Sequence, residues 1–417
     1  MEIRNNPSSF NEIDNIRKLF KLWHNYSGAG TGEVRELLKK ARCLGALCLT
    51  REIKTLPRTI DKLVHLRYLD LSHIYELEFL PATVCKLNNL QTLKLIECWS
   101  LKELPTKLSK LEKLRCLDIE GCGRLALMPP RMGKLTCLEK LPQFVVSHSQ
   151  EGQANRGRLQ DLEALTNVGG SLKISVRGFS THQVTEGAKC VRGMIHLIDI
   201  HIEISCLFNN DAGSTLLLEC LQPNCNLIHF NLYGYGGVAF PNWESIEDLE
   251  ASLPKLVEFW LGDCANLLNL PLLRQLHHLK TLNLISSNDL TLKFCNNENL
   301  KSFSIVEELF RSRLSSSLCS LQVKKWRYLK SLCGGGLEHL TALQTLHLSE
   351  LYDLEELEDG NHSHLPWKFL TRLRDLKLQY LPKLVNLPQG IEHLAALQSL
   401  HVEACKSFEH SAECVSR

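Results

Sequence analysis

The sequence lacks the features that would assign it to a membrane, a secretory route or a highly charged partner. Its 417 residues contain no apolar run of the roughly 18 residues that a membrane-spanning helix needs. The opening residues MEIRNNPSSFNEID show no secretory signal pattern. The 48 basic and 46 acidic residues nearly cancel, so no field of one sign favours nucleic acid or an acidic membrane. We therefore expect a cytoplasmic or nucleocytoplasmic chain without membrane or nucleic-acid partners.

The common catalytic and cofactor motifs are also missing. The stretch GAGTGEVREL has the glycines of a phosphate loop, but Glu33 stands where that loop needs a cation. There is no Gly-x-Ser-x-Gly elbow, and the acidic run Asp353–Asp359 lacks the interleaved oxygen ligands of a calcium loop. None of the 17 cysteines forms a C-x-x-C pair. We expect no catalytic residues, no metal and no cofactor in this chain.

What the sequence does contain is a repeat. From Leu66, the segments LRYLDLSHIYELEFLPATVCKLNN, LQTLKLIECWSLKELPTKLSKLEK and LRCLDIEGCGRLALMPPRMGKLTC follow one another with a period of 24. Each places apolar residues at its first, fourth, sixth, ninth and twelfth positions and a proline at its sixteenth. In the second segment these residues are Leu90, Leu93, Leu95, Cys98, Leu101 and Pro105.

This spacing is that of the leucine-rich repeat. The alternating L-x-L core predicts a short strand with leucines pointing in, and the proline suits the return side of the coil. Strands from successive coils stack in parallel, because one coil alone cannot bury both of its open faces. The predicted fold is α/β: a leucine-rich-repeat solenoid, or horseshoe, with a parallel concave β-sheet and mostly irregular or short-helical returns.

The same phase continues less regularly along the chain. We expect a leading segment at 1–41 as a candidate partial cap, a first array at 42–143, an exposed connecting loop at 144–170 and a second array at 171–417. Further coils open at Leu44, Leu197, Leu227, Leu256, Leu279, Leu318, Leu343, Leu373 and Leu397, with a weaker one near Ser171.

Cys98 and Cys122 occupy the ninth position of successive coils. Their backbones should lie about 4.8 Å apart, which permits a disulfide. A reducing compartment disfavours that bond, and isoleucine fills the same position in the preceding coil. A small buried side chain with a weak S–H donor is sufficient there.

Binding, if any, should use the residues that point outward between the strand leucines. They are polar and mixed in charge, with aromatic residues among them, which suits protein recognition. Any sheet face exposed to solvent would also be polar. Trp260 stands out, since an outward indole leaves a large apolar surface exposed unless something covers it. The candidate protein-binding residues on the concave face are Arg67, Tyr68, Asp70, Lys94, Arg115, Asp118, Glu120, His201, His229, Tyr233, Glu258, Trp260, His347, Arg374, Lys377 and His401.

The repeats resemble the leucine-rich region of plant intracellular nucleotide-binding disease-resistance proteins of the coiled-coil class. The resemblance covers most of residues 42–405. The segments that carry it are HLRYLDLS at His65, NLQTLKLIECWSLKELP at Asn89, LRCLDIEGCGRLALMP at Leu114, GKLTCLEKLPQFVVS at Gly133, LLECLQPNCNLIHFNLYGYGGVAFPNW at Leu217 and LVNLPQGIEHLAALQSLHVEAC at Leu384.

The resemblance implies a non-enzymatic sensor of plant innate immunity that recognises a pathogen effector or a modified host protein. It also implies a nucleotide-binding domain as a partner, in cis or in trans. That domain's motifs are missing from this chain, so ADP or ATP is not assigned to it. A leucine-rich-repeat adaptor, such as the substrate-binding part of a ubiquitin ligase, is the alternative.

Overall fold

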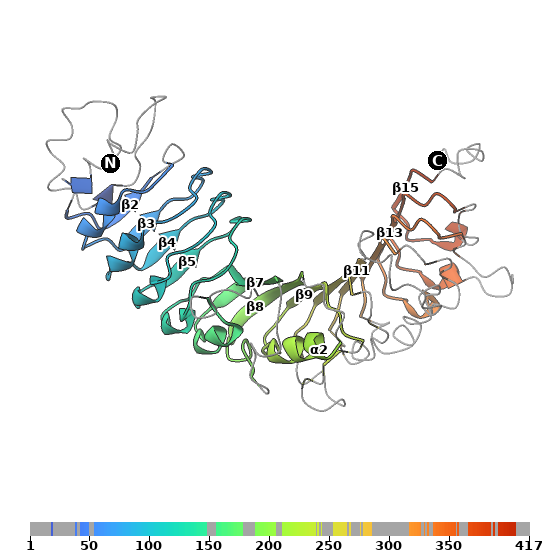
Figure 1. The fold of residues 1–417 in the computed structure, drawn as a ribbon. Coiled ribbons are helices and arrows are strands. Elements are labelled where there is room, and N and C mark those ends of the chain that lie inside the picture. The colour runs from blue at the N-terminus through green and yellow to red at the C-terminus, as the bar shows by residue number, and fades with distance from the viewer. Residues whose placement is uncertain are drawn as a thin grey trace, which may run out of the picture. The chain divides into compact units, whose positions relative to one another are not determined.

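The fold is described from a computed structural model of the chain (Figure 1). Most of the predicted leading segment 1–41, the long insertion at 286–316 and the tail 406–417 lie outside the residues that the structure describes. The described residues are 18–19, 38–39, 42–49, 54–147, 156–177, 188–205, 211–238, 240–241, 243, 253–264, 267, 276, 278–285, 317–326, 329, 332, 337–355, 357, 366–384, 387 and 391–405.

The chain divides into two compact units, each built from stacked coils. The first unit comprises Met1–Leu207 and Cys220–Asn224, and the second comprises Phe208–Glu219 and Cys225–Arg417. This division falls later in the chain than the boundary between the two arrays predicted from the sequence.

In the first unit, parallel strands follow one another in chain order (Figure 1). β3, β4 and β5 pair in strict register, so that Leu69, Leu93 and Leu117 lie side by side. The strands are β1 (Lys18–Leu19), β2 (Ala46–Cys48), β3 (Tyr68–Asp70), β4 (Thr92–Lys94), β5 (Cys116–Asp118), β6 (Gln143–Ser147), β7 (Gly169–Arg177) and β8 (His196–Ile204). The return segments include the 3-10 helices Arg58–Lys62, Ala82–Lys86, Leu108–Lys110, Met132–Lys134 and Leu159–Ala164.

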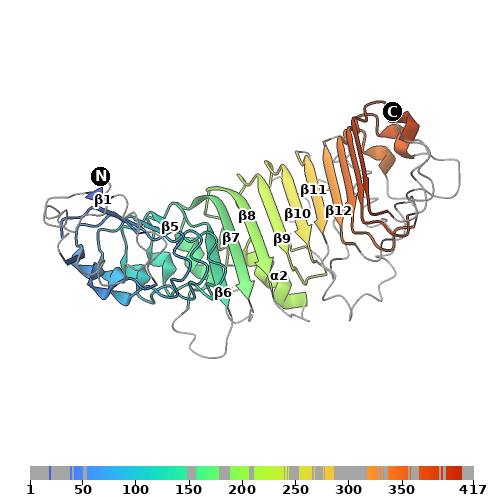
Figure 2. The same cartoon turned by 90° about the horizontal axis from the view of Figure 1, so that it is seen from above.

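The second unit repeats this plan, with five residues in every strand from β9 to β15, and Figure 2 shows β9 to β12 side by side. Every neighbouring pair from β9 to β15 is parallel and keeps one register, which places Phe259, Leu282 and Leu321 in a single inward row. The elements are α2 (Asp211–Cys220), β9 (His229–Tyr233), β10 (Glu258–Gly262), β11 (Thr281–Ile285), β12 (Ser320–Lys324), β13 (Thr345–Ser349), β14 (Asp375–Gln379), β15 (Ser399–Glu403) and the 3-10 helices Leu337–His339, Pro366–Phe369 and Ile391–His393.

The predicted coil openings are confirmed. Leu66, Leu90 and Leu114 are completely buried, and each lies just before a strand. The less regular openings behave in the same way, except that Leu197 lies inside β8 and Leu397 in the last coil is only partly buried. The weaker opening expected near Ser171 is not confirmed, because Ser171 is exposed within β7. The openings that are fully or almost fully buried are Leu44, Leu197, Leu227, Leu256, Leu279, Leu318, Leu343 and Leu373. The fold is therefore the expected parallel β-solenoid of stacked coils with few helices.

Most of the described strands are followed by a residue with positive φ, which turns the chain into the core. In the first unit these residues are His73 (φ 63°), Glu97 (φ 54°) and Gly121 (φ 75°). A non-glycine residue in this conformation costs about 1–2 kcal/mol. The next residue points inward and is buried, as Cys98 and Cys122 show. The ninth position of the repeat is thus the inward end of a left-handed turn.

The cysteines at this position are free thiols that tie one coil to the one before it. The Cys98 thiol donates to the carbonyl oxygen of Leu71 at 3.1 Å, and the Cys122 thiol donates to that of Leu95 at 3.1 Å. Burial raises the pKa of Cys98 to about 11 and that of Cys122 to about 12. The expectation of a small buried side chain with a weak donor is confirmed.

The Leu-Pro steps begin the return segments, as predicted. Pro57 and Pro81 directly precede 3-10 helices, and their φ angles of −61° and −65° suit the entry into a helical turn. Each of these helices places apolar residues in the core, among them Ile60 and Val84.

The stretch 144–170, which we expected as an exposed connecting loop, is corrected by the structure. Its described residues contain most of β6, the 3-10 helix Leu159–Ala164 and the start of β7. Phe144 and Val145 are fully buried. The backbone of β6 also bonds to the preceding coil, since the Met128 N–H donates to the Val145 carbonyl oxygen at 2.9 Å.

We predict that native Cys98 and Cys122 resist alkylation by iodoacetamide at pH 7.5. Both are fully buried, and their raised pKa values leave little thiolate to react. Exposed Cys137 and Cys225 serve as internal controls and should react first. Peptide mass spectrometry after timed labelling measures the order. Equal labelling of Cys98 and Cys137 in the folded protein would contradict the buried position.

Candidate functional site

The side chains that lie between the inward strand residues form an outward layer on each unit, which we call the sheet face. On β14, Leu376 and Leu378 are completely buried, whereas Asp375 and Gln379 are half-buried and Lys377 is exposed. The strand alternation places all predicted site residues on or beside this face. All of them except Asp118 are at least partly exposed.

Tyr68, Asp70 and Lys94 form a cluster on β3 and β4. The Tyr68 hydroxyl donates to Asp70 Oδ2 at 3.0 Å, and Lys94 Nζ lies 5.8 Å from the centre of the Tyr68 ring. Asp70 Oδ1 accepts the backbone N–H of Ser72 at 3.0 Å, which fixes the carboxylate. Burial and the adjacent Asp70 charge hold the pKa of Tyr68 well above its ordinary value. The cluster therefore presents a neutral phenol with a cation above its ring.

Asp118, the next acidic residue of this row, is not available to a partner. It is completely buried, and Lys140 Nζ donates to its Oδ2 at 2.7 Å. The reason is local: the chain passes beside β5 at residue 140, where Lys140 and Cys116 form an isolated parallel bridge. The prediction that Asp118 lies on an exposed face was wrong, and its role is to anchor Lys140.

Arg67, Arg115 and Glu120 lie at the edges of the same face and are exposed. Arg115 Nε donates to Glu139 Oε1 at 3.0 Å, and this bond raises the pKa of the guanidinium. An ion pair this exposed contributes little to stability, so its charges are available for binding.

His201 on β8 lies directly beside Lys173 of β7. Burial, followed by the Lys173 charge, lowers the pKa of His201, so the imidazole is neutral at pH 7. Lys173 Nζ pairs with Glu203 at 2.7 Å and holds the pKa of that carboxyl below its usual value, although burial opposes the shift.

On the second unit, His229, Glu258 and Trp260 meet on β9 and β10. His229 Nε2 lies 4.0 Å from Glu258 Oε2, and the Trp260 indole N–H donates to Glu258 Oε1. Trp260 is only partly exposed. The expectation of a largely uncovered indole is therefore corrected: its polar edge is bound within the face.

Tyr233 extends across the neighbouring strand. A Cβ atom at Gly262 would lie 2.2 Å from Cδ1 of the Tyr233 ring, so only glycine leaves room for this ring position. Tyr233 and Gly262 are register partners on β9 and β10. The lack of a side chain at Gly262 therefore makes room for the ring of Tyr233, which is one of the predicted binding residues.

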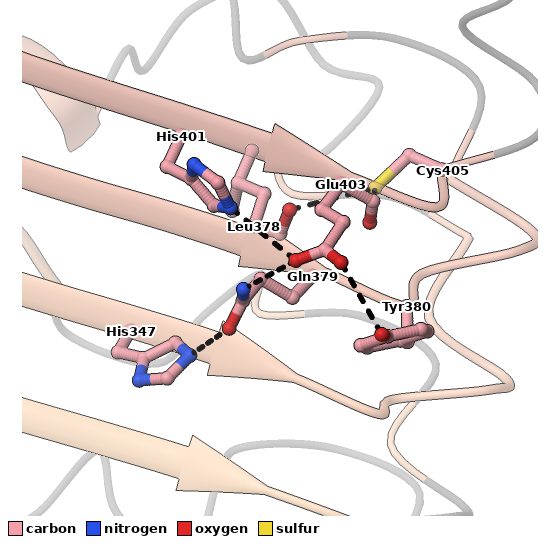
Figure 3. Close-up of polar contacts among 7 residues, drawn as sticks. All are labelled: His347, Leu378, Gln379, Tyr380, His401, Glu403 and Cys405. Carbon is pink, nitrogen blue, oxygen red and sulfur yellow. Dashed lines mark hydrogen bonds and ion pairs between the residues drawn. The ribbon is translucent and has the colours of Figure 1, made fainter.

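The most connected part of the sheet face is a polar network on β12 to β15, formed by Gln322, His347, Gln379, His401 and Glu403. Figure 3 shows its members His347, Gln379, His401 and Glu403. Gln322 Nε2 lies 3.2 Å from His347 Nδ1, and His347 Nε2 lies 2.8 Å from Gln379 Oε1. Gln379 Nε2 donates to Glu403 Oε2 at 2.7 Å. His401 Nε2 lies 3.3 Å from the same oxygen.

These contacts fix the direction of every hydrogen bond in the network. Gln379 Oε1 only accepts, so His347 Nε2 carries the proton and His347 Nδ1 accepts from Gln322. His347 is therefore the neutral Nε2–H tautomer. Burial is the main cause that lowers its pKa, which is consistent with the neutral form. The hydrogen bonds therefore run in one direction, from Gln322 through His347 and Gln379 to the Glu403 carboxylate, which also accepts from His401.

Glu403 is the acceptor at the end of this network. Hydrogen bonds from His401, Gln379 and Tyr380 lower its pKa. Lys377, in the same outward row as His347 and His401, and Arg374, just before β14, add exposed positive charge. This part of the face offers a hydrogen-bonded carboxylate and two exposed cations, which are groups that can bind a polar protein surface.

Several residues of the face were not among the predicted set. Gln322 and Gln379 are outward by the alternation alone, yet only the structure shows that they join His347 to Glu403. Tyr380 occupies the left-handed turn after β14, where the leucine pattern gives no signal for it. Lys140 and Lys173 were missed because each lies in a coil with irregular spacing.

Among the described residues, no group of three or more His, Cys, Asp or Glu is arranged to hold a metal ion. Within the same residues, the structure contains no helix with the length and apolar character needed to cross a membrane.

We predict that replacing His347 with Gln removes a pH dependence of stability. A lowered pKa means that, below about pH 6.5, the unfolded chain binds more protons than the folded chain, so stability falls as the pH falls through this window. Denaturant unfolding of the wild type and of His347→Gln between pH 5 and 8 measures the difference. The exposed His393→Gln variant is the control. Parallel curves for the wild type and His347→Gln would contradict the assigned neutral tautomer.

The comparisons with known proteins agree with this geometry. A curated relative, the disease resistance protein RGA2 of Solanum bulbocastanum, is 30% identical over 157 residues, which make up 36% of this chain and 14% of that protein. The chain therefore matches only a small part of the relative's length. A solved leucine-rich-repeat protein of Leptospira interrogans superimposes with a TM-score of 0.55 at 19% identity, covering 97% of this chain and 94% of that one. This likeness shows the fold alone.

Residues 43–353 match the family model described as a leucine-rich repeat region. The matched span contains the strands from β2 to β13 and the left-handed turns between them. Since it makes up more than half of the chain, the protein belongs to the leucine-rich repeat family.

Proposed function

We propose that the chain is a non-enzymatic protein-recognition module of plant innate immunity. In this proposal it senses a pathogen effector, or a host protein altered by one, through the sheet face. Arg67, Tyr68, Lys94, Arg374 and Lys377 would make direct contacts, with the polar network on β12 to β15 as a second contact region.

The observation that carries the proposal is that each strand has an apolar inward side and a polar or aromatic outward side. The inward residues form a continuous apolar core, and the outward residues are polar or aromatic, partly exposed and held by hydrogen bonds to one another. Side chains that are already ordered lose little conformational entropy on binding. A surface built in this way favours recognition of another protein.

The immune assignment is supported by the relative with which the chain shares 30% identity, a disease resistance protein. The chain matches only 14% of that protein, so the recognition role is carried over as a proposal and the relative's other activities are not.

A variant with Tyr68, Trp260 and Arg374 changed to alanine tests the proposal. Interface anchors of these types commonly contribute about 1–2 kcal/mol each or more, so we expect partner capture from host extract to fall by roughly 100-fold or more. The matched control changes the exposed Lys62, Lys110 and Lys368, which lie on return helices. Quantitative pull-down of full-length protein measures both variants, and thermal unfolding confirms that both fold.

Equal recovery of the same partners by the face variant and by the return-helix variant would refute the use of the sheet face. The identity of the partners separates the two functions considered. Effector or effector-modified host proteins support immune recognition, whereas reproducible recovery of ubiquitin-ligase subunits would instead support an adaptor.

A further inference from the structure

Two buried cysteines of the first unit lie in contact and take no part in the sheet face. The Sγ atoms of Cys190 and Cys220 are 2.7 Å apart, and the two residues are 0% and 1% exposed. The chain places them at equivalent points, since each lies seven residues before the leucine that opens the next coil, Leu197 or Leu227.

The backbone holds the two cysteines in this position. The Cys190 N–H donates to the carbonyl oxygen of Cys220 at 2.8 Å. This backbone bond and the 2.7 Å between the two Sγ atoms bring the pair close to the geometry that a disulfide needs. The bond can therefore form without a large movement of either segment.

A neighbouring amide fixes the same two segments. The side chain of Asn224 is buried, and its Nδ2 donates to the carbonyl oxygens of Met194 at 2.8 Å and Leu197 at 3.0 Å. The segment 220–224 is thus fastened to residues 190–197 at both of its ends. The contact between the two sulfur atoms belongs to an anchored part of the unit.

Cys98 and Cys122 provide a natural comparison. They are also one coil apart and buried, but each thiol points to a backbone carbonyl of the preceding coil instead of to the other thiol. The coil spacing alone therefore does not bring two sulfur atoms together, and the arrangement at Cys190 and Cys220 is specific to this pair.

We propose that Cys190 and Cys220 form a site of reversible disulfide formation, with a peroxide as the oxidant. The thiolate of one cysteine attacks one oxygen of hydrogen peroxide, the O–O bond breaks, and a sulfenic acid and hydroxide form. The sulfur of the other cysteine then attacks the sulfenic sulfur, the S–O bond breaks, and the S–S bond forms. The proton released from each thiol ends in one of two water molecules.

The two thiols share a hydrogen bond that either sulfur can donate, so either cysteine can supply the first nucleophile. The resulting disulfide closes a covalent loop that contains β8 and its face residues His201 and Glu203.

The test treats the full chain with hydrogen peroxide and then denatures it in the presence of N-ethylmaleimide, which blocks the remaining free thiols. Peptide mass spectrometry without reduction then identifies the linked peptides. We expect the Cys190–Cys220 linked peptide to be the main linked species, at least tenfold above Cys98–Cys122, and to disappear after dithiothreitol. Cys190→Ser and Cys220→Ser should each abolish it.

A second measurement covers the case in which a serine variant folds poorly. Oxidised wild type should melt at a higher temperature than reduced wild type, because the bond restricts the unfolded chain. Cys98→Ser should keep this difference. The proposal is overturned if peroxide gives only sulfinic or sulfonic cysteine at these positions, or if linkage is no greater than for Cys98 and Cys122. Neither result bears on recognition by the sheet face.

Discussion

The structure depends on one constraint: a coil can bury its apolar side only against the next coil. Leu69, Leu93 and Leu117 satisfy it by lying in register on adjacent strands, each completely buried. The register fixes the spacing of the strands, and the left-handed turns at His73 and Glu97 direct the next residue into the same core. Because the inward residues alone meet this requirement, the outward residues are free to serve another purpose.

The sequence predicts this fold wherever the period is regular, because one leucine spacing specifies the strand, the turn and the return together. Prediction fails at 144–170 for a physical reason. In β6, the three successive residues Phe144, Val145 and Val146 are all buried, so side chains on both faces of the strand are covered. A strand buried on both sides loses the alternation on which the prediction depends.

The sequence predicts which residues lie on the sheet face, but it does not predict which of them contact one another. By strand alternation, Asp118 and Lys377 should both point outward. Asp118 is nevertheless paired with Lys140 and unavailable, because the chain passes beside β5 at residue 140. Gln322 and His347 are register partners, so the repeat places them side by side, but it does not predict the hydrogen bond between them. Gln379 lies two positions further along its strand, and its bond to His347 is not specified by the repeat.

We predict that the outward side chains are dispensable for folding. The most direct measurement is the denaturant unfolding midpoint of a variant with the exposed Arg67, Arg374 and Lys377 changed to alanine, compared with the wild type. Exposed polar substitutions away from buried networks usually change stability by no more than about 0.5 kcal/mol each, so we expect a nearly unchanged, equally cooperative transition. A loss comparable to that of truncating one buried leucine, about 2–5 kcal/mol, would contradict it.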